Sequence, residues 1–216
     1  GFELALVEKT TYRTLAALAK DNGLKRIGFE SMNLPYGAAE ELKKFTAECR
    51  LFPVKGLVER LRAVKDADEL GLIRRSVNIT KRVFDVVGGL IKPGVTEKYL
   101  SGRIEIEFIN GGARAGFAPI VASGKNSSKP HARPDDKKIG KDGFLMIDLG
   151  CNLEGYNSDM TRMVILGKVK DKFKKIYNIV RDASMKAMDM IAPGVRISEI
   201  DLAARSRIKD EGFGKY

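Results

Sequence analysis

The sequence of 216 residues is poor in the residue types that several protein classes depend on. Its one histidine, His131, excludes an imidazole-rich metal site built from this chain alone. Neither Cys49 nor Cys151 has a second ligand at metal-binding spacing, so we interpret both as small buried residues in a reducing compartment. No apolar run approaches the roughly 18 residues of a membrane span, and the opening residues do not resemble a secretion signal. We therefore expect a cytoplasmic protein with no membrane partner.

The charge is strongly positive but spread along the chain. The net charge is +11, which could attract nucleic acid or an acidic surface. The densest cationic segment, residues 168–175, places its lysines around apolar residues such as Phe173. This pattern is typical of a solvated helix face, so we do not expect nucleic acid as a partner.

The first part of the chain alternates helix and strand signals, and 44% of the whole sequence is apolar, enough for a genuine core. We predict a helix at 9–20, a strand at 26–29, a helix at 35–47 and a strand at 50–54. This stretch is too short to be a complete domain. We therefore divide the chain into residues 1–56, the remnant of an N-terminal α/β domain, and residues 57–216.

An internal repeat organises the second part. A long amphipathic helix is predicted from Asp66 to the Pro93-Gly94 pair. The segment IKPGV at 91–95 then recurs as IAPGV at 191–195, each time between two predicted helices. The first copy leads into a strand-rich stretch from about 115 to 166. Because duplicated halves should match, the repeat predicts a second such stretch after Tyr216, and hence a chain that is cut.

Two carboxylates are the main candidates for chemistry. Asp148 lies near the end of an apolar strand, and Asp159 opens the next strand. A hairpin centred on Leu153 and Glu154 would set the two aspartates directly opposite each other, with Cβ atoms roughly 5 Å apart. Such a pair needs a shared proton or intervening cations, and two metal ions about 3.5–4 Å apart fit that geometry.

Simpler interpretations of these residues stay open. Asp148 could cap the end of its strand, and Asp159 could pair with Arg162. His131 could be a plain surface residue, because its loop is rich in turn-forming residues.

Five motifs taken together resemble the pita-bread metallopeptidases, in particular the branch of Xaa-Pro aminopeptidases and Xaa-Pro dipeptidases (prolidases). They are RAVKD at 62–66, FAPIVASG at 117–124, PH at 130–131, IDLG at 147–150 and GYNSDMTR at 155–162. The resemblance covers residues 57–216. Residues 1–56 resemble the C-terminal part of the creatinase/prolidase-like N-terminal domain of that branch.

The resemblance implies an α/β (α+β) pita-bread fold: a curved, mostly antiparallel sheet with outer helices and an internal pseudo-twofold duplication. It implies that Asp148 is a metal ligand and that Asp159 bridges two metal ions. His131 would contact substrate and help to protonate the leaving nitrogen, with Thr161 as a supporting residue beside the ligands.

The implied reaction is hydrolysis of the bond before proline, at the N-terminus of peptides or in dipeptides. Two divalent ions would activate a water, with manganese expected and cobalt or zinc left open. The implied substrates are small peptides with proline in the second position, and the implied assembly is a homodimer.

The sequence departs from the family at its end. The family completes its metal site with a histidine and two glutamates that would lie beyond Tyr216, so we expect this polypeptide alone to bind metals poorly and to be inactive. Two alternatives follow. One is a metal-free creatinase-type hydrolase, which would not need both aspartates. The other is a non-catalytic pita-bread module that binds protein or nucleic acid.

Overall fold

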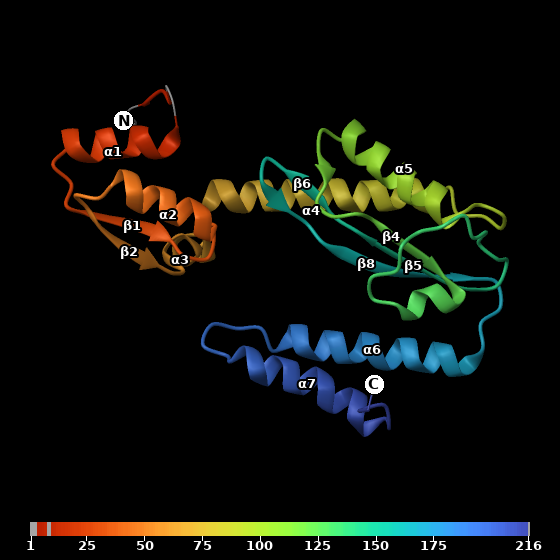
Figure 1. Cartoon of the computed structure of the whole chain (residues 1–216). Helices are drawn as coiled ribbons and strands as arrows, with labels where there is room; N and C mark the ends of the chain where they lie inside the picture. Colours follow the sequence, from red (N-terminus) through yellow and green to blue (C-terminus); the bar gives the residue numbers. More distant parts are fainter. Residues whose placement is uncertain (1–3, 8–9, 216) are drawn as a thin grey trace. The chain divides into compact units, whose positions relative to one another are not determined.

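The computed structural model describes residues 4–7 and 10–215, and the chain divides into two compact units, 1–66 and 67–216. Residues 9 and 216, which bound predicted segments, lie outside the described residues. The first unit runs α1 (Thr11–Asp21), β1 (Arg26–Glu30), α2 (Tyr36–Phe45), β2 (Arg50–Val54) and α3 (Leu57–Ala63) (Figure 1). Its two strands are parallel, and its first four elements confirm the predicted order.

The short helix α3 is the element of this unit that the sequence did not reveal. It follows Gly56, which has a φ of 68° and no side chain to cap the helix. None of its residues is buried. Leu57, Val58 and Leu61 recur at helical spacing but are exposed, and seven residues are too few for the periodic pattern to distinguish a helix from a linker.

The second unit contains both halves of the predicted repeat. It begins with α4 (Ala67–Gly88) and α5 (Glu97–Asn110) and ends with α6 (Asp171–Asp189) and α7 (Ile197–Asp210). Between them lie β3 (Arg114–Ala115), β4 (Ile120–Ser123), the 3₁₀ turn η1 (Gly124–Ser128), β5 (Gly143–Leu149), β6 (Cys151–Leu153), β7 (Tyr156–Asn157) and β8 (Met160–Leu166). These strands form two antiparallel sheets, in the orders β4-β5-β8 and β3-β6-β7.

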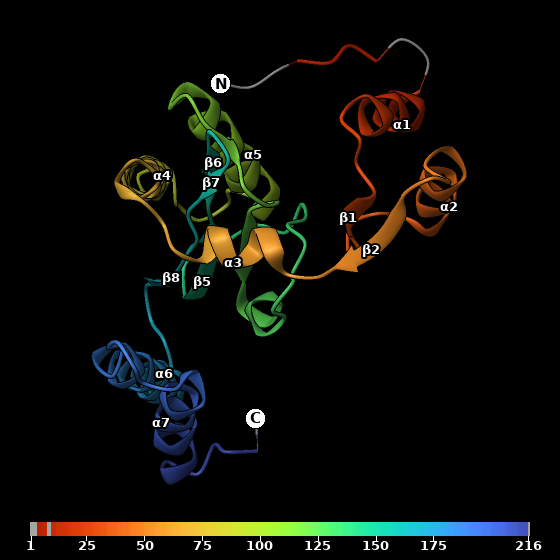
Figure 2. The ribbon, with the colours of Figure 1, turned by 90° about the vertical axis from the view of Figure 1, so that its left-hand side faces the viewer.

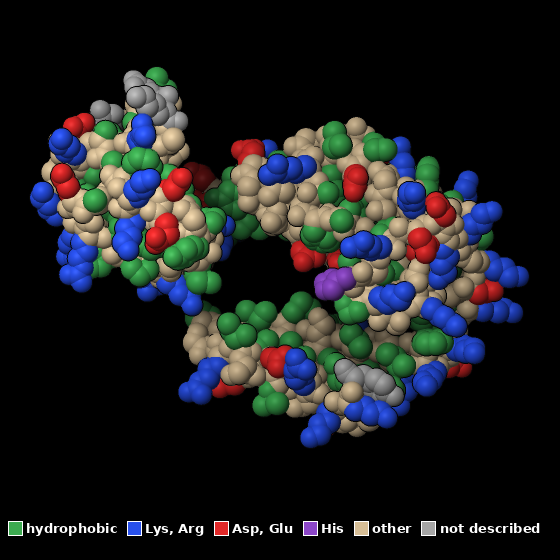
Figure 3. All heavy atoms as spheres, in the orientation of Figure 1, with side chains coloured by type: hydrophobic (Ala, Val, Ile, Leu, Met, Phe, Trp, Pro, Cys, Tyr) green, Lys and Arg blue, Asp and Glu red, His purple; other side chains and the backbone are tan. Residues whose placement is uncertain are grey.

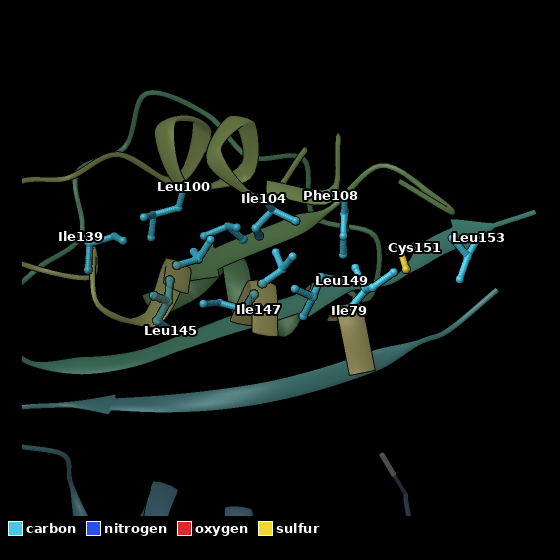
Figure 4. Packing of buried hydrophobic residues seen from close by; sticks show 13 residues of the cluster. Ile79, Leu100, Ile104, Phe108, Ile139, Leu145, Ile147, Leu149, Cys151 and Leu153 are labelled. Atoms are coloured by element: carbon cyan, nitrogen blue, oxygen red, sulfur yellow. The ribbon is translucent and has the colours of Figure 1, made fainter. Parts of the chain in front are cut away.

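The core of this unit lies between the helices α4 and α5 and one face of the strands. Apolar residues recur every fourth position on α5, at Leu100, Ile104 and Phe108, and all three are fully buried. In Figure 4 they point toward Leu145, Ile147 and Leu149 of β5. Each such side chain contributes about 1.5–3 kcal/mol on burial. Because strand residues alternate between faces, the intervening residues of β5, including Asp148, face away from these helices.

The helical part of the repeat is visible in the backbone. Helices α5 and α7 have residue numbers that differ by 100 at both ends. The preceding turns match as well, since Gly94 has a φ of 93° and Gly194 a φ of 88°. Such positive values are accessible to glycine at little cost, which explains why both copies keep it.

The hairpin from β5 to β8 has a different register from the predicted one. Its turn is the pair Glu154 and Gly155, with φ values of 52° and 92°. Two central residues with positive φ are typical of a type I′ turn. Asp148 consequently pairs with Thr161, so the prediction that it lies directly opposite Asp159 is wrong.

Gly150 lies where the hairpin passes from one sheet to the other. A Cβ atom built there would lie 2.0 Å from the main-chain oxygen of Ser158 and 2.8 Å from the ring of Phe117. Both distances are shorter than a van der Waals contact. The strands can therefore approach each other at this point because residue 150 has no side chain.

Helices α6 and α7 run side by side in Figures 1 and 2 and are joined near the end of α7 by charged groups. An Nη1 hydrogen of Arg207 bonds to Oε1 of Glu211 at 2.7 Å, and Nζ of Lys175 on α6 lies 3.4 Å from Oε2. The pKa of the Glu211 carboxyl is lowered, chiefly by the hydrogen bond from Arg207 and then by the one from Lys175.

We expect Gly150→Ala to lower the free energy of unfolding by about 1–3 kcal/mol, because the added methyl group overpacks the strand crossing. Gly102→Ala is the matched control: Gly102 lies inside α5 with nothing within 4 Å of the added Cβ. That change should raise stability by about 0.5–1 kcal/mol. Urea unfolding measures both variants. An unchanged midpoint for Gly150→Ala would contradict the close approach described here.

Glu211 should make stability depend on pH in the acid range. Because its pKa is lower in the folded state, its stabilisation is complete above the unfolded pKa and is lost as pH falls through the folded pKa. The stability difference between the native protein and Glu211→Gln should therefore be larger at pH 7 than at pH 3, as urea unfolding at the two values would measure. Glu105 is an exposed residue of α5, so Glu105→Gln is the control for the loss of one negative charge. An equal difference at both pH values would contradict the role of Glu211.

Candidate functional site

Asp148 and Thr161 form the central contact of the candidate site. Asp148 is partly exposed near the end of β5, on the face away from α4 and α5. Thr161 lies opposite it on β8, and its hydroxyl donates a hydrogen bond of 2.7 Å to Oδ1 of Asp148. This bond fixes the orientation of the carboxylate while the second oxygen can still take a ligand.

Asp159 belongs to the same hairpin. It is exposed and lies two residues before Thr161, in the short segment between β7 and β8. The pairing of β5 with β8 ends at Leu149 and Met160, and continuing that register by one residue would place Asp159 diagonally from Asp148, with Cβ atoms about 7 Å apart. This separation is wider than the direct opposition that the sequence predicted.

A buried hydroxyl cluster supports the backbone beside Asp159. Ser158 accepts a hydrogen bond from the main-chain N–H of Cys151 at 3.1 Å. Its hydroxyl also lies 2.9 Å from Oγ of Ser76 and 2.7 Å from Oγ1 of Thr80, both on α4. All four residues are buried. Because Ser158 points toward α4, Asp159 points away from it.

The sequence analysis predicted no role for this cluster, although the spacing of two hydroxyl residues on α4 indicated a buried polar contact. Ser76 and Thr80 are four residues apart on the buried side of α4, where the other buried residues are Ile79, Val83 and Val87. Two hydroxyls on an otherwise apolar stripe require a buried polar partner. The partner, Ser158, is 78 residues beyond Thr80, so its identity depends on the tertiary fold.

His131 is exposed in the loop that follows η1. Within residues 4–7 and 10–215, no hydrogen bond or ion pair joins it to Asp148 or Asp159. The structure thus joins Asp148 to Thr161 by a hydrogen bond and places the exposed Asp159 two residues before Thr161. It places His131 on the connection between β4 and β5 without a direct contact to either aspartate.

The donor atoms of the site suit a hard divalent cation. Two carboxylates and a neighbouring hydroxyl offer only oxygen, which magnesium and manganese prefer. Across the described part of the chain, no group of three or more His, Cys, Asp or Glu side chains is close enough to hold a metal ion. The residues present therefore fit part of a metal ligand set.

The surface shows no concentration of charge on the face drawn in Figure 3, where lysine and arginine are scattered among acidic and neutral groups. Among the described residues, no helix combines the length and apolar character needed to cross a membrane.

Comparison with known proteins identifies relatives over the whole chain. The Xaa-Pro dipeptidase of Pyrococcus horikoshii is 34% identical over 195 residues, which are 90% of this chain and 55% of that protein. The structure of a Xaa-Pro dipeptidase from Bacillus anthracis matches with a TM-score of 0.96 and 32% identity, over 100% of this chain and 61% of that one. The structure of an X-Pro aminopeptidase from Thermotoga maritima matches with a TM-score of 0.92 and 28% identity, over 100% of this chain and 62% of that one.

This chain therefore spans between 55% and 62% of the length of these three proteins. The structural matches confirm the predicted α/β pita-bread fold. Residues 2–64 match the model of the creatinase/prolidase N-terminal domain, and residues 71–216 match that of metallopeptidase family M24. Since the second match covers most of the sequence, the chain belongs to metallopeptidase family M24.

Proposed function

We propose that the carboxylates of Asp148 and Asp159 serve a metal-dependent hydrolysis of the peptide bond that precedes proline. The observation that carries the proposal is the hydrogen bond that Thr161 donates to Asp148, with the exposed Asp159 two residues before Thr161 in the same hairpin. The printed names of the relatives, which are Xaa-Pro dipeptidase and X-Pro aminopeptidase, support the substrate class.

Each residue has a proposed role. Asp148 and Asp159 would hold the divalent metal ions, with Asp159 as the ligand shared between them, and Thr161 would keep the Asp148 carboxylate in its binding orientation. When bound, the two divalent ions, manganese or alternatively cobalt or zinc, supply a water of lowered pKa and polarise the substrate carbonyl. His131 donates a hydrogen bond to the substrate and helps to protonate the leaving nitrogen.

The substrates follow from the same comparison. We propose small peptides with proline in the second position, and the names of the relatives leave open whether these are dipeptides or longer peptides. We further propose that residues 1–56 are the C-terminal part of a creatinase/prolidase-like domain and that the active assembly is a homodimer. The match of residues 2–64 to that domain supports the first of these proposals.

Manganese should bind at the aspartates and can be detected through its paramagnetism. Titrating Mn²⁺ into the isotope-labelled chain should broaden the amide NMR signals of residues 148, 159 and 161 first. Asp148→Asn and Asp159→Asn should each abolish this selective broadening, because each removes a charged oxygen ligand. Asp85 is an exposed residue of α4, so Asp85→Asn is the control for the loss of one carboxylate away from the site. Broadening that persists in both site variants would place the metal elsewhere.

Thr161→Val should weaken manganese affinity by about 10- to 100-fold, because the hydrogen bond that orients Asp148 is lost while the volume is kept. Thr161→Ser retains a hydroxyl and should restore most of the affinity. Isothermal titration with Mn²⁺ compares the three proteins. Equal affinities for all three would refute the orienting role of Thr161.

Because we expect residues 1–216 alone to be inactive, hydrolysis is tested on the intact protein, incubated with Mn²⁺ and an Ala-Pro dipeptide, an Ala-Pro-Ala tripeptide or an Ala-Ala control. We expect metal-dependent release of alanine from one or both proline peptides and none from the control. Cleavage that is independent of metal would favour the creatinase-type alternative. Salt-sensitive binding to generic DNA or RNA, without cleavage, would favour the non-catalytic module.

A further inference from the structure

Glu97 is a fully buried carboxylate for which the proposed reaction has no use. It lies in the first turn of α5. Its Oε1 accepts hydrogen bonds from both the main-chain N–H and the hydroxyl of Ser123, each at 2.7 Å. Its Oε2 accepts a hydrogen bond from the side-chain amide of Asn126 at 3.1 Å. Glu97 therefore binds the end of β4 and the 3₁₀ turn η1 at the same time.

The same residue also binds the far end of the loop that follows. The main-chain N–H of Glu97 donates to the carbonyl of Lys137 at 3.1 Å, and Thr96 forms a β-bridge with Lys138. Nζ of Lys137 lies 3.9 Å from Oε1 of Glu97. The loop from η1 to Lys137 is thus attached to one residue of α5 at both its beginning and its end.

Burying the carboxylate of Glu97 costs free energy, and the contacts of that carboxylate offset the cost. A buried carboxylate is stable only when charges or hydrogen bonds compensate for the lost water, and here three donors and one cation do so. Fixing both ends of a loop removes most of the conformations available to the residues between them. His131 is one of those residues.

We infer that Glu97 is a positioning residue, which fixes the two ends of the loop that presents His131. A catalytic effect of Glu97 rests on the proposed function, in which His131 contacts the substrate. The attachment of the loop to Glu97 does not rest on the proposed function, so the attachment and the catalytic effect can be tested separately.

The single histidine allows a direct test. In a protein without a histidine tag, the Cε1–H group of His131 gives one imidazole NMR signal, since the chain has no other histidine. Glu97→Gln should shift or broaden that signal. Glutamine has one accepting oxygen where glutamate has two, so if that oxygen keeps the contacts with Ser123, an NH₂ group faces the side-chain amide of Asn126, and the negative charge beside Lys137 is lost. Glu105→Gln, an exposed change on the same helix, should leave it unchanged.

A second, milder variant guards against loss of folding. Asn126→Ala removes one of the three side-chain contacts of the Glu97 carboxylate and should move the His131 signal in the same direction by less. Far-UV circular dichroism checks that each variant keeps its helices. A His131 signal that stays unchanged in both folded variants would overturn the inference, whatever the peptidase activity.

Kinetics separate positioning from folding. If the protein cleaves an Ala-Pro peptide, Glu97→Gln should lower kcat on the order of 10- to 100-fold with little change in KM, because a displaced proton donor affects the chemical step. An unchanged kcat together with a shifted His131 signal would count against the catalytic role of His131, and an unchanged kcat together with an unchanged signal would overturn the inference. A His131 signal that changes in a protein without peptidase activity would support the attachment of the loop and count against the proposed function.

Discussion

The packing of α5 against β5 is the contact on which the rest of the second unit depends. It buries Leu100, Ile104 and Phe108 against alternate residues of the strand and so decides which face of β5 is the inner one. Because strand residues alternate, the same packing places Asp148 on the opposite face. A shift of β5 by one residue would exchange the two faces and bury the carboxylate among apolar side chains, at a large cost in free energy.

Two buried polar groups add to this apolar contact, and each connects a helix to a segment that carries a candidate residue. The hydroxyls of Ser76 and Thr80 on α4 hold Ser158, next to Asp159. The carboxylate of Glu97 on α5 holds both ends of the loop that carries His131. Buried polar groups need specific partners, whereas apolar side chains tolerate many arrangements. The polar contacts therefore fix positions that apolar packing alone would leave variable.

Membership of metallopeptidase family M24 and the geometry of the hairpin support each other. A metallopeptidase needs metal ligands, and Asp148 and Asp159 are the acidic candidates in the hairpin. The hairpin adds what the family match does not give, namely that Asp148 pairs with Thr161 and accepts a hydrogen bond from its hydroxyl. The reaction, the metals and the substrates remain proposals, since this chain spans 55% to 62% of the relatives compared here.

The sequence by itself determined most elements of the fold and the internal repeat, because hydrophobic periodicity and strand alternation are local properties. It did not determine the register of the hairpin. The flanking residues Asn152 and Gly155 favoured a type I turn, whereas the observed turn lies one residue later and gives Glu154 a positive φ, which is uncommon for a residue other than glycine. The helix packing, the absent side chain at Gly150 and the hydrogen bonds of Ser158 decided the register, because these contacts join residues far apart in sequence and no local pattern records them.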